Sequence, residues 1–219
     1  MKATHAPAHA KRLPLRLASI LLAVILMLLF PASTLGAGTP RLQVNNYHWA
    51  DTPRDIFLYC STSDFTYSER ETIRDALAEW NAIRSYSGQY MVSMYLTTND
   101  DPNEIEGAFV FENHGSDFVA HTYHVESDNG ELYSVDIVFN STCNFSVGGS
   151  STSYDIQTVA QHELGHVLGV AHCHEEDVAD EDCWSATCTS NVMHLDIGLG
   201  EVRTVMQPYD IGSYKSIYS

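Results

Sequence analysis

The sequence of 219 residues predicts an α+β fold, with a lobe of about five β-strands and two helices followed by a small, irregular C-terminal lobe. Two observations support this class. Five short segments have the composition of strands, and two longer segments carry apolar residues at helical spacing. No internal repeat or low-complexity linker interrupts the chain after residue 37. We therefore expect one domain over residues 53–219, preceded by a short N-terminal segment, 38–52.

The predicted strands are rich in β-branched and aromatic residues, or alternate apolar with polar residues. In the second of them Val92, Met94 and Leu96 alternate with more polar side chains, as expected for a half-buried strand. The five segments are Asp55–Cys60, Met91–Thr97, Gly107–Phe111, Phe118–Val125 and Leu132–Phe139.

The first predicted helix begins at Ser68, because Glu71 lies three residues later and completes a capping box. Its apolar residues recur at helical spacing and form one buried stripe: Ile73, Leu77 and Trp80. The second predicted helix follows Ser153 or Asp155, either of which is a good N-cap. Its expected buried residues are Ile156, Val159, Val167 and Leu168.

Residues 162–172 read HELGHVLGVAH and carry the strongest functional signal in the chain. On a helix, His162 and His166 lie one turn apart on the same face, where two imidazoles can share one Zn²⁺. Glu163 lies beside them with a carboxylate for acid–base chemistry. Gly169 permits the left-handed residue that ends a helix, so that the chain can return His172 as a third nitrogen ligand. Three neutral ligands and an open position are typical of a catalytic zinc site.

The alternative is a helix with ordinary surface histidines. HExxH by itself arises by chance in about one of a few hundred chains of this length. The additional match of Gly169 and His172 lowers that rate by roughly three orders of magnitude. The chain is rich in histidine, with 11 residues, but this enrichment does not reverse the odds. The pattern therefore favours a zinc site.

The motif is similar, at every fixed position, to the zinc-binding consensus HExxHxxGxxH of the metzincin clan of metalloendopeptidases. Tyr154–Gln161 resembles the segment that leads into the active-site helix of matrixins, and Val135–Asn140 resembles the strand before it. The resemblance implies a metzincin-like two-lobed domain with a mixed sheet, in which substrate lies in a cleft between the lobes. It also implies that Pro208–Tyr218 contains the C-terminal helix.

Metzincins carry a methionine turn downstream of the third histidine, and Met193 and Met206 are the candidates here. We prefer Met193, because Met206 leaves almost no chain between the turn and the C-terminal helix. The resemblance gives Met193 a structural role beneath the imidazoles. Some metzincins place a tyrosine two residues after this methionine as a further ligand or donor. This chain has Leu195 there, so that role is absent or another group fills it.

The resemblance implies a zinc-dependent endopeptidase. His162, His166 and His172 would hold the catalytic Zn²⁺, which activates a water by lowering its pKa, and Glu163 would act as the general base. An edge strand, expected at Phe118–Val125, would align an extended substrate by backbone pairing. Proteins and peptides are therefore the expected partners.

Two further segments are candidates for metal binding. His114, Asp117 and His121 resemble the structural zinc site of matrixins, but the later histidine of that site has no match here, and ordinary surface residues are the alternative. Glu175–Asp182 carries six acidic residues among eight, which makes Ca²⁺ a candidate cofactor, with a solvated loop as the alternative.

Residues 1–37 predict a secretory signal peptide. They hold four basic and no acidic residues, a nearly unbroken apolar run of 14 residues from Leu17 to Phe30, and small residues after it. A membrane anchor is the alternative, but the run is shorter than the ~20 residues that span a bilayer. We expect a secreted protein without stable membrane insertion.

The charge of the chain is strongly negative, with 11 basic against 28 acidic side chains. Removal of the four basic residues of the leader leaves 7 against 28, a formal charge of −21. Nucleic acids and anionic membrane surfaces are poor partners for such a protein. Nothing in the sequence indicates an oligomeric state.

Five cysteines lie after the leader: Cys60, Cys143, Cys173, Cys183 and Cys188. In an exported protein we expect disulfides. Cys183 with Cys188 would close a local loop, and Cys60 with Cys143 would join the first strand to the late sheet, which leaves Cys173 over. The sequence leaves the pairing open. Many matrixins are made latent by a pro-segment cysteine, but no cysteine precedes Cys60, and we expect no such latency.

The sequence thus predicts a secreted zinc metalloendopeptidase of the metzincin type. The alternative is a secreted zinc- or calcium-binding module on the same fold, without turnover. Glu163 favours the enzyme, because a site that only stores metal needs no general base.

Overall fold

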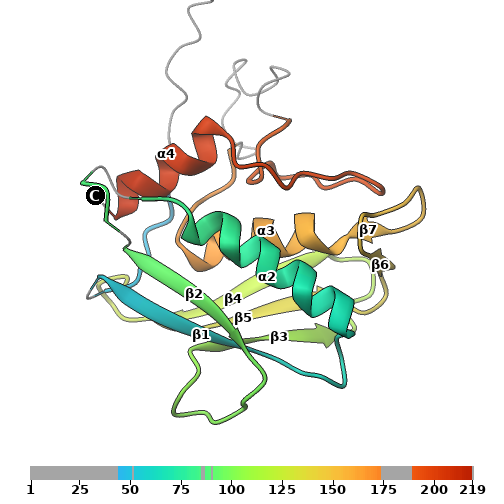
Figure 1. The fold of residues 1–219 in the computed structure, drawn as a ribbon, viewed down its shortest axis with the longest axis horizontal. Helices are drawn as coiled ribbons and strands as arrows, with labels where there is room; N and C mark the ends of the chain where they lie inside the picture. The colour runs from blue at the N-terminus through green and yellow to red at the C-terminus, as the bar shows by residue number, and fades with distance from the viewer. Residues whose placement is uncertain (1–43, 51, 85–86, 90, 174–188, 219) are drawn as a thin grey trace, which may run out of the picture. The chain divides into compact units, whose positions relative to one another are not determined.

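A five-stranded mixed sheet lies at the centre of the fold in the computed structural model of the chain (Figure 1). The structure describes residues 44–50, 52–84, 87–89, 91–173 and 189–218. The strands, in order across the sheet, are β2 (Val92–Thr97), β1 (Arg54–Cys60), β3 (Gly107–Glu112), β5 (Leu132–Asn140) and β4 (Ala120–Glu126). The first four run parallel, and β4 pairs antiparallel with β5 at the edge. The prediction of a mixed sheet of about five strands is confirmed.

Two helices, α2 (Tyr67–Asn81) and α3 (Ile156–Val167), cover one face of this sheet (Figure 1). The inward side chains of the strands, including Ile56, Phe109 and Ile137, pack against them and are fully buried. A short pair of parallel strands, β6 (Phe145–Ser146) and β7 (Tyr154–Asp155), precedes α3 and was not predicted. Residues 189–207 contain no strand, and the C-terminal helix α4 (Pro208–Ile217) follows them as expected.

The predicted capping box of the first helix, Ser68 with Glu71, is wrong by two residues, because Thr66 and Glu69 form the box and the helix begins at Tyr67. Thr66 is the N-cap, and its hydroxyl accepts a hydrogen bond from the Glu69 backbone N–H at 3.3 Å. The Glu69 carboxylate accepts in return from the Thr66 backbone N–H at 2.7 Å. Phe65 explains the choice between the boxes. Its buried ring stacks on Phe111 and fixes the chain immediately before Thr66.

The segment before β1 is attached to both ends of the domain. The backbone of Leu132, at the start of β5, donates to His48 O at 2.9 Å. The Trp49 indole is buried, and its Nε1 donates to Val167 O, at the end of α3, at 2.8 Å. The Tyr218 hydroxyl, after α4, accepts from the Trp49 backbone N–H at 3.3 Å. This segment therefore ties the end of α3 to the β4–β5 hairpin and to the C-terminal helix.

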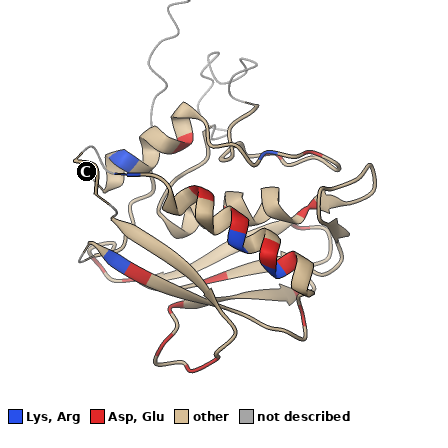
Figure 2. Cartoon of the chain, in the orientation of Figure 1, with Lys and Arg blue, Asp and Glu red and all other residues tan. Residues whose placement is uncertain are grey.

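Charged side chains are mostly acidic in the part of the chain that the structure describes (Figure 2). The loop between β2 and β3 carries only acidic charges, whereas α2 presents both signs on its exposed side (Figure 2). Among the described residues, no helix is long and apolar enough to cross a membrane.

The structure contradicts the predicted disulfide between Cys60 and Cys143, since both are free thiols. Cys60 points inward from β1 into the core and is fully buried, whereas Cys143 is half-buried in the turn after β5. The alternation of β1 decides this, because it commits the Cys60 side chain to the sheet face that the helices cover. Cys173 is buried, and Cys183 and Cys188 lie outside the described residues.

Burial raises the pKa of the Cys60 thiol from 9.0 to about 12. A raised thiol pKa contributes stability that is present below pH 9 and is lost as the pH rises toward 12. At pH 8 we therefore expect iodoacetamide to modify Cys60 at least about 100-fold more slowly than Cys143, because the thiolate is the nucleophile. Mass spectrometry of the native protein measures the ratio. If denaturation without reductant left both unmodified, a disulfide would be present after all.

Candidate metal centre and active site

The helix α3 carries the first two histidines of the motif and is fixed at both ends. Asp155 is its N-cap, one of the two residues predicted, and its carboxylate accepts from the Thr158 backbone N–H at 2.9 Å. After α3, Gly169 has a φ of +79°, the left-handed conformation expected there. A Cβ at Gly169 would also lie 2.5 Å from Tyr47 O. The turn therefore requires glycine, and it returns His172 toward the helix.

The structure brings His162, His166 and His172 together. Their ligand nitrogens all lie within 4.8 Å of one another, and theirs is the single group of potential metal ligands found among the described residues. The Nε2 atom of His172 lies 3.1 Å from that of His162 and 3.0 Å from that of His166. Nitrogen ligands of a tetrahedral Zn²⁺, each about 2.0–2.1 Å from the metal, lie roughly 3.3 Å from one another. The spacing of the three rings is therefore close to that of a shared zinc ion.

Hydrogen bonds to the other ring nitrogens determine which atoms face the shared point. His162 Nδ1 donates to Val192 O, and His166 Nδ1 donates to Val170 O, each at 2.9 Å. Because a carbonyl only accepts, Nδ1 carries the hydrogen in both rings and Nε2 keeps its lone pair. Lone pairs that converge in a buried site repel one another unless a cation lies between them. The donor set thus fits a bound zinc ion.

The imidazoles are held in the neutral form that binds metals. Burial lowers the pKa of His166 to about 3, with a further contribution from His172, and lowers that of His172 to about 4. Burial likewise holds the pKa of His162 well below its usual value. No proton then competes with a metal ion for these nitrogens at neutral pH.

Glu163 is buried, with 4% of its surface exposed, and points toward the edge strand β4. The Thr122 hydroxyl, on β4, lies 2.7 Å from Glu163 Oε2 and donates to it. Burial raises the pKa of the Glu163 carboxyl to about 7, although the hydrogen bonds from Thr122 act in the opposite direction. A carboxyl with a pKa near neutrality is suited to take up and return a proton.

Both candidate methionines contact α3: Met193 packs against Gly165, near the histidines, and the Met206 sulfur accepts from Gln161 Nε2 at 3.0 Å. Met193 is fully buried, and a Cβ added at Gly165 would lie 2.1 Å from its sulfur. Glycine at 165, one residue before His166, is therefore what allows this approach. The α4 residue Asp210 holds the turn, because its carboxylate accepts from the backbone N–H groups of Val192 and Met193, each at 3.1 Å.

A cleft of about 780 Å³ runs past the triad. Residues 118–124 form one side, and α3 contributes Val159, His162, Glu163 and His166. Leu195–Ile197 line the cleft toward the Thr158 end of α3, and Asn45 and Tyr47 line it toward the Gly169 turn. Glu163 and the three histidines therefore face a space large enough for several residues of a peptide.

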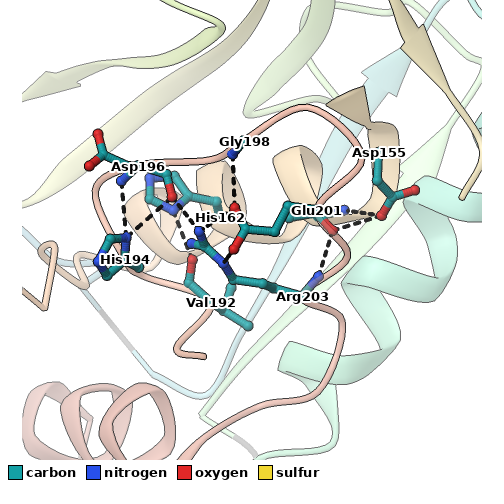
Figure 3. Close-up of polar contacts among 9 residues, drawn as sticks. Asp155, His162, Val192, His194, Asp196, Gly198, Glu201 and Arg203 are labelled. Carbon is teal, nitrogen blue, oxygen red and sulfur yellow. Dashed lines mark hydrogen bonds and ion pairs between the residues drawn. The ribbon is translucent and has the colours of Figure 1, made fainter. Parts of the chain in front are cut away.

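Arg203 holds the wall formed by Leu195–Ile197 (Figure 3). Its side chain is 6% exposed, forms an ion pair with Glu201 at 2.6 Å, and donates to Asp196 O. The Glu201 carboxylate also accepts from the Gly198 backbone N–H at 2.8 Å. The Arg203 backbone N–H donates to the Thr158 hydroxyl at 2.9 Å, which ties this loop to the first turn of α3.

The candidate second zinc site does not assemble into a metal-binding group in the part of the chain that the structure describes. The His114 ring instead pairs with Glu112 at 3.0 Å and packs at a tilt against the Phe118 ring. The His121 ring packs edge-on against Tyr123. Asp117 lines the cleft. The acidic segment Glu175–Asp182 lies outside the described residues, so calcium binding there stays a prediction.

Three residues that shape the site were missed in the sequence: Tyr47, Thr122 and Asp210. Each is distant in sequence from the residues it contacts: the shortest separation, between Asp210 and Met193, is 17 residues. Thr122 and Asp210 are buried polar side chains, and this burial, which only the folded chain shows, is what identifies them.

Comparison with known proteins agrees with this geometry. Residues 58–193 match the family model for matrixins, and the chain belongs to this family. Among individual proteins, karilysin of Tannerella forsythia is 31% identical over 142 residues. That match covers 58% of this chain and 28% of karilysin, so the chain spans less than a third of this relative's length. The resemblance to matrixin-like metzincins predicted from the motif is confirmed.

Two solved structures are similar in part. The structure of myroilysin has 14% sequence identity and a TM-score of 0.45, and the match covers 80% of this chain and 97% of that chain. The GM1-bound form of the ECX AB5 holotoxin has 15% identity and a TM-score of 0.35, with 60% and 61% of the two chains covered.

Proposed function

We propose that the protein is a secreted, zinc-dependent endopeptidase. The observation that carries this proposal is the convergence of three Nε2 atoms beside a buried carboxylate in a cleft. The Nε2 atom of His172 lies 3.1 Å from that of His162 and 3.0 Å from that of His166. Membership of the matrixin family, which is zinc-dependent, supports it.

His162, His166 and His172 would hold the zinc ion. A zinc ion supplies a Lewis acid that polarises the scissile carbonyl and lowers the pKa of a nucleophilic water. Glu163 takes a proton from the attacking water and returns it to the nitrogen of the departing amine. Thr122 orients this carboxylate by its hydrogen bond at 2.7 Å, and the partial burial of the site excludes competing solvent.

The edge strand β4 supports a peptide as substrate. Among the described residues it pairs with β5 alone, so its other side presents backbone groups without a strand partner there, along the cleft. An extended peptide that adds to this edge would present its carbonyls to the triad in turn. Proteins and peptides are thus the proposed substrates.

The basic and apolar pattern of residues 1–37 supports export, with the catalytic domain at 53–219 after a short segment, 38–52. N-terminal sequencing of protein recovered from the medium of expressing cells tests this part. A first residue between 33 and 39 is expected, and retention of the intact leader in the cell would contradict export.

Removal of the metal tests the function. We expect 1,10-phenanthroline to abolish hydrolysis of casein, and addition of Zn²⁺, but not Ca²⁺ alone, to restore it, because only a metal at the three nitrogens activates water. Inductively coupled plasma mass spectrometry should find one zinc ion per chain. A zinc-loaded protein that cleaves neither casein nor gelatin would instead be a metal-binding module, and hydrolysis indifferent to chelation would exclude the metal mechanism.

A further inference from the structure

Tyr47 lines the cleft although it precedes the part of the chain that matches the matrixin family. It belongs to the segment Val44–Trp49, which is held by backbone and side-chain contacts to the domain. Tyr47 is half-buried, and Asn45 lines the same end of the cleft.

The segment is paired with the turn that follows α3. Val44 forms an antiparallel bridge with Val170, and the Asn45 backbone N–H donates to Gly169 O at 2.8 Å. Val170 O, which accepts from His166 Nδ1, also accepts from Asn45 Nδ2 at 3.4 Å. Tyr47 is therefore positioned by the same turn that returns His172 to the triad.

The Tyr47 ring also contacts the edge strand. Its centroid lies 4.0 Å from that of the His124 ring. His124 lies two residues after Thr122 on β4, so both side chains point to the same face of the strand. Two strand residues span roughly 7 Å. Tyr47 thus lies about that far along the strand from the residue that contacts Glu163, toward the Gly169 turn and away from Leu195–Ile197.

The Tyr47 hydroxyl has a free hydrogen. Its oxygen accepts from Asn45 Nδ2 at 2.9 Å, and no acceptor for its own hydrogen is found among the described residues. Burial raises the pKa of Tyr47 to about 12, and the nearby charges of Glu126 and Glu163 act in the same direction. The group therefore remains a neutral hydrogen-bond donor over the whole neutral range.

We propose that Tyr47 binds substrate, and that its hydroxyl donates a hydrogen bond to a backbone carbonyl of the bound peptide about two residues from the scissile bond. The Asn45 amide aims the hydroxyl by occupying its acceptor side, and the His124 ring fixes the plane of the tyrosine. The inference rests on the proposed function and assigns a binding residue in the N-terminal segment to it.

Binding to an inactive protein separates this inference from catalysis. In zinc-loaded Glu163→Gln, fluorescein-labelled ten-residue peptides that tile casein are titrated by anisotropy with and without Tyr47→Phe. We expect the second change to weaken binding of the best peptide about tenfold, the value of one hydrogen bond. Tyr133→Phe, at an exposed tyrosine on β5 outside the cleft, is the matched control and should leave binding unchanged.

Kinetics with Glu163 intact locate the contact. Tyr47→Phe should raise KM about tenfold and leave kcat and zinc content unchanged. Shortening the peptide from one end should abolish this difference, whereas shortening it from the other end should not. Equal affinity with and without the hydroxyl, or the same loss for peptides shortened at either end, would overturn the inference. If the wild-type protein hydrolyses casein while binding is indifferent to Tyr47→Phe, the inference fails and the proposed function stands. If peptides bind through Tyr47 but are not hydrolysed, Tyr47 is a peptide-binding residue and the proposed function fails.

Discussion

Replacement of Glu163 by glutamine is expected to lower kcat for casein peptides by about 10³- to 10⁴-fold, the upper part of the range for loss of a general base. Glutamine has nearly the same shape and its amide oxygen still accepts the hydrogen bond from Thr122, but it cannot take a proton from water. Zinc content and the thermal midpoint should remain close to those of the wild type, so that the loss is assigned to chemistry.

The control for this variant is Glu79→Gln, which removes the same charge from an exposed position on α2. Steady-state kinetics and metal analysis give kcat and the zinc content for both variants and the wild type. A Glu163→Gln protein that keeps more than about a tenth of the wild-type kcat would exclude Glu163 as the base.

Replacement of Asp210 by alanine is expected to lower the free energy of unfolding by several kcal/mol, since a buried donor left without its acceptor costs about 1–3 kcal/mol. The Asp210 carboxylate accepts from three backbone N–H groups, those of Val192, Met193 and Gln207, at 2.9–3.1 Å. Asp210 itself is fully buried, and water cannot replace the carboxylate without rearrangement.

The same change should weaken zinc binding about 10- to 100-fold, as loss of support for metal ligands commonly does. Val192 both donates to Asp210 and accepts from His162 Nδ1, so a loosened Val192 no longer fixes the His162 ring. Urea unfolding and competition with a zinc chelator measure the two effects. Asp128→Ala, at an exposed aspartate between β4 and β5, is the control. Asp210→Asn keeps one acceptor, so its free energy of unfolding and its zinc affinity should lie between those of the wild type and Asp210→Ala. An Asp210→Ala protein as stable as the wild type would contradict this account.

The sequence predicted best those features that neighbouring residues determine. The alternation of Val92, Met94 and Leu96 located β2 to within one residue, because the side-chain period of a strand is local. The fourth strand was placed at Phe118–Val125, whereas β4 is Ala120–Glu126, since pairing with β5 begins only opposite Phe139. Strand ends depend on the partner strand, which the segment's own sequence does not contain.

The predictions that were wrong, the start of α2 and one cysteine pairing, concern features that depend on contacts with distant parts of the fold. Two capping boxes overlap at the start of α2, and burial of Phe65, rather than any difference between the boxes, selected Thr66. The pairing of Cys60 with Cys143 was plausible from redox compartment alone, but the inward face of β1 placed Cys60 in the core.

By itself the sequence determined the three imidazoles and the adjacent carboxylate, because His162, Glu163, His166 and His172 lie within eleven residues and helix geometry with one left-handed glycine brings them together. Only the tertiary structure decided what surrounds them. Thr122 reaches Glu163 across 41 positions, Asp210 reaches Met193 across 17, and Tyr47 reaches the cleft from before the first strand. Those contacts arise from the packing of separate elements, and no local spacing encodes them.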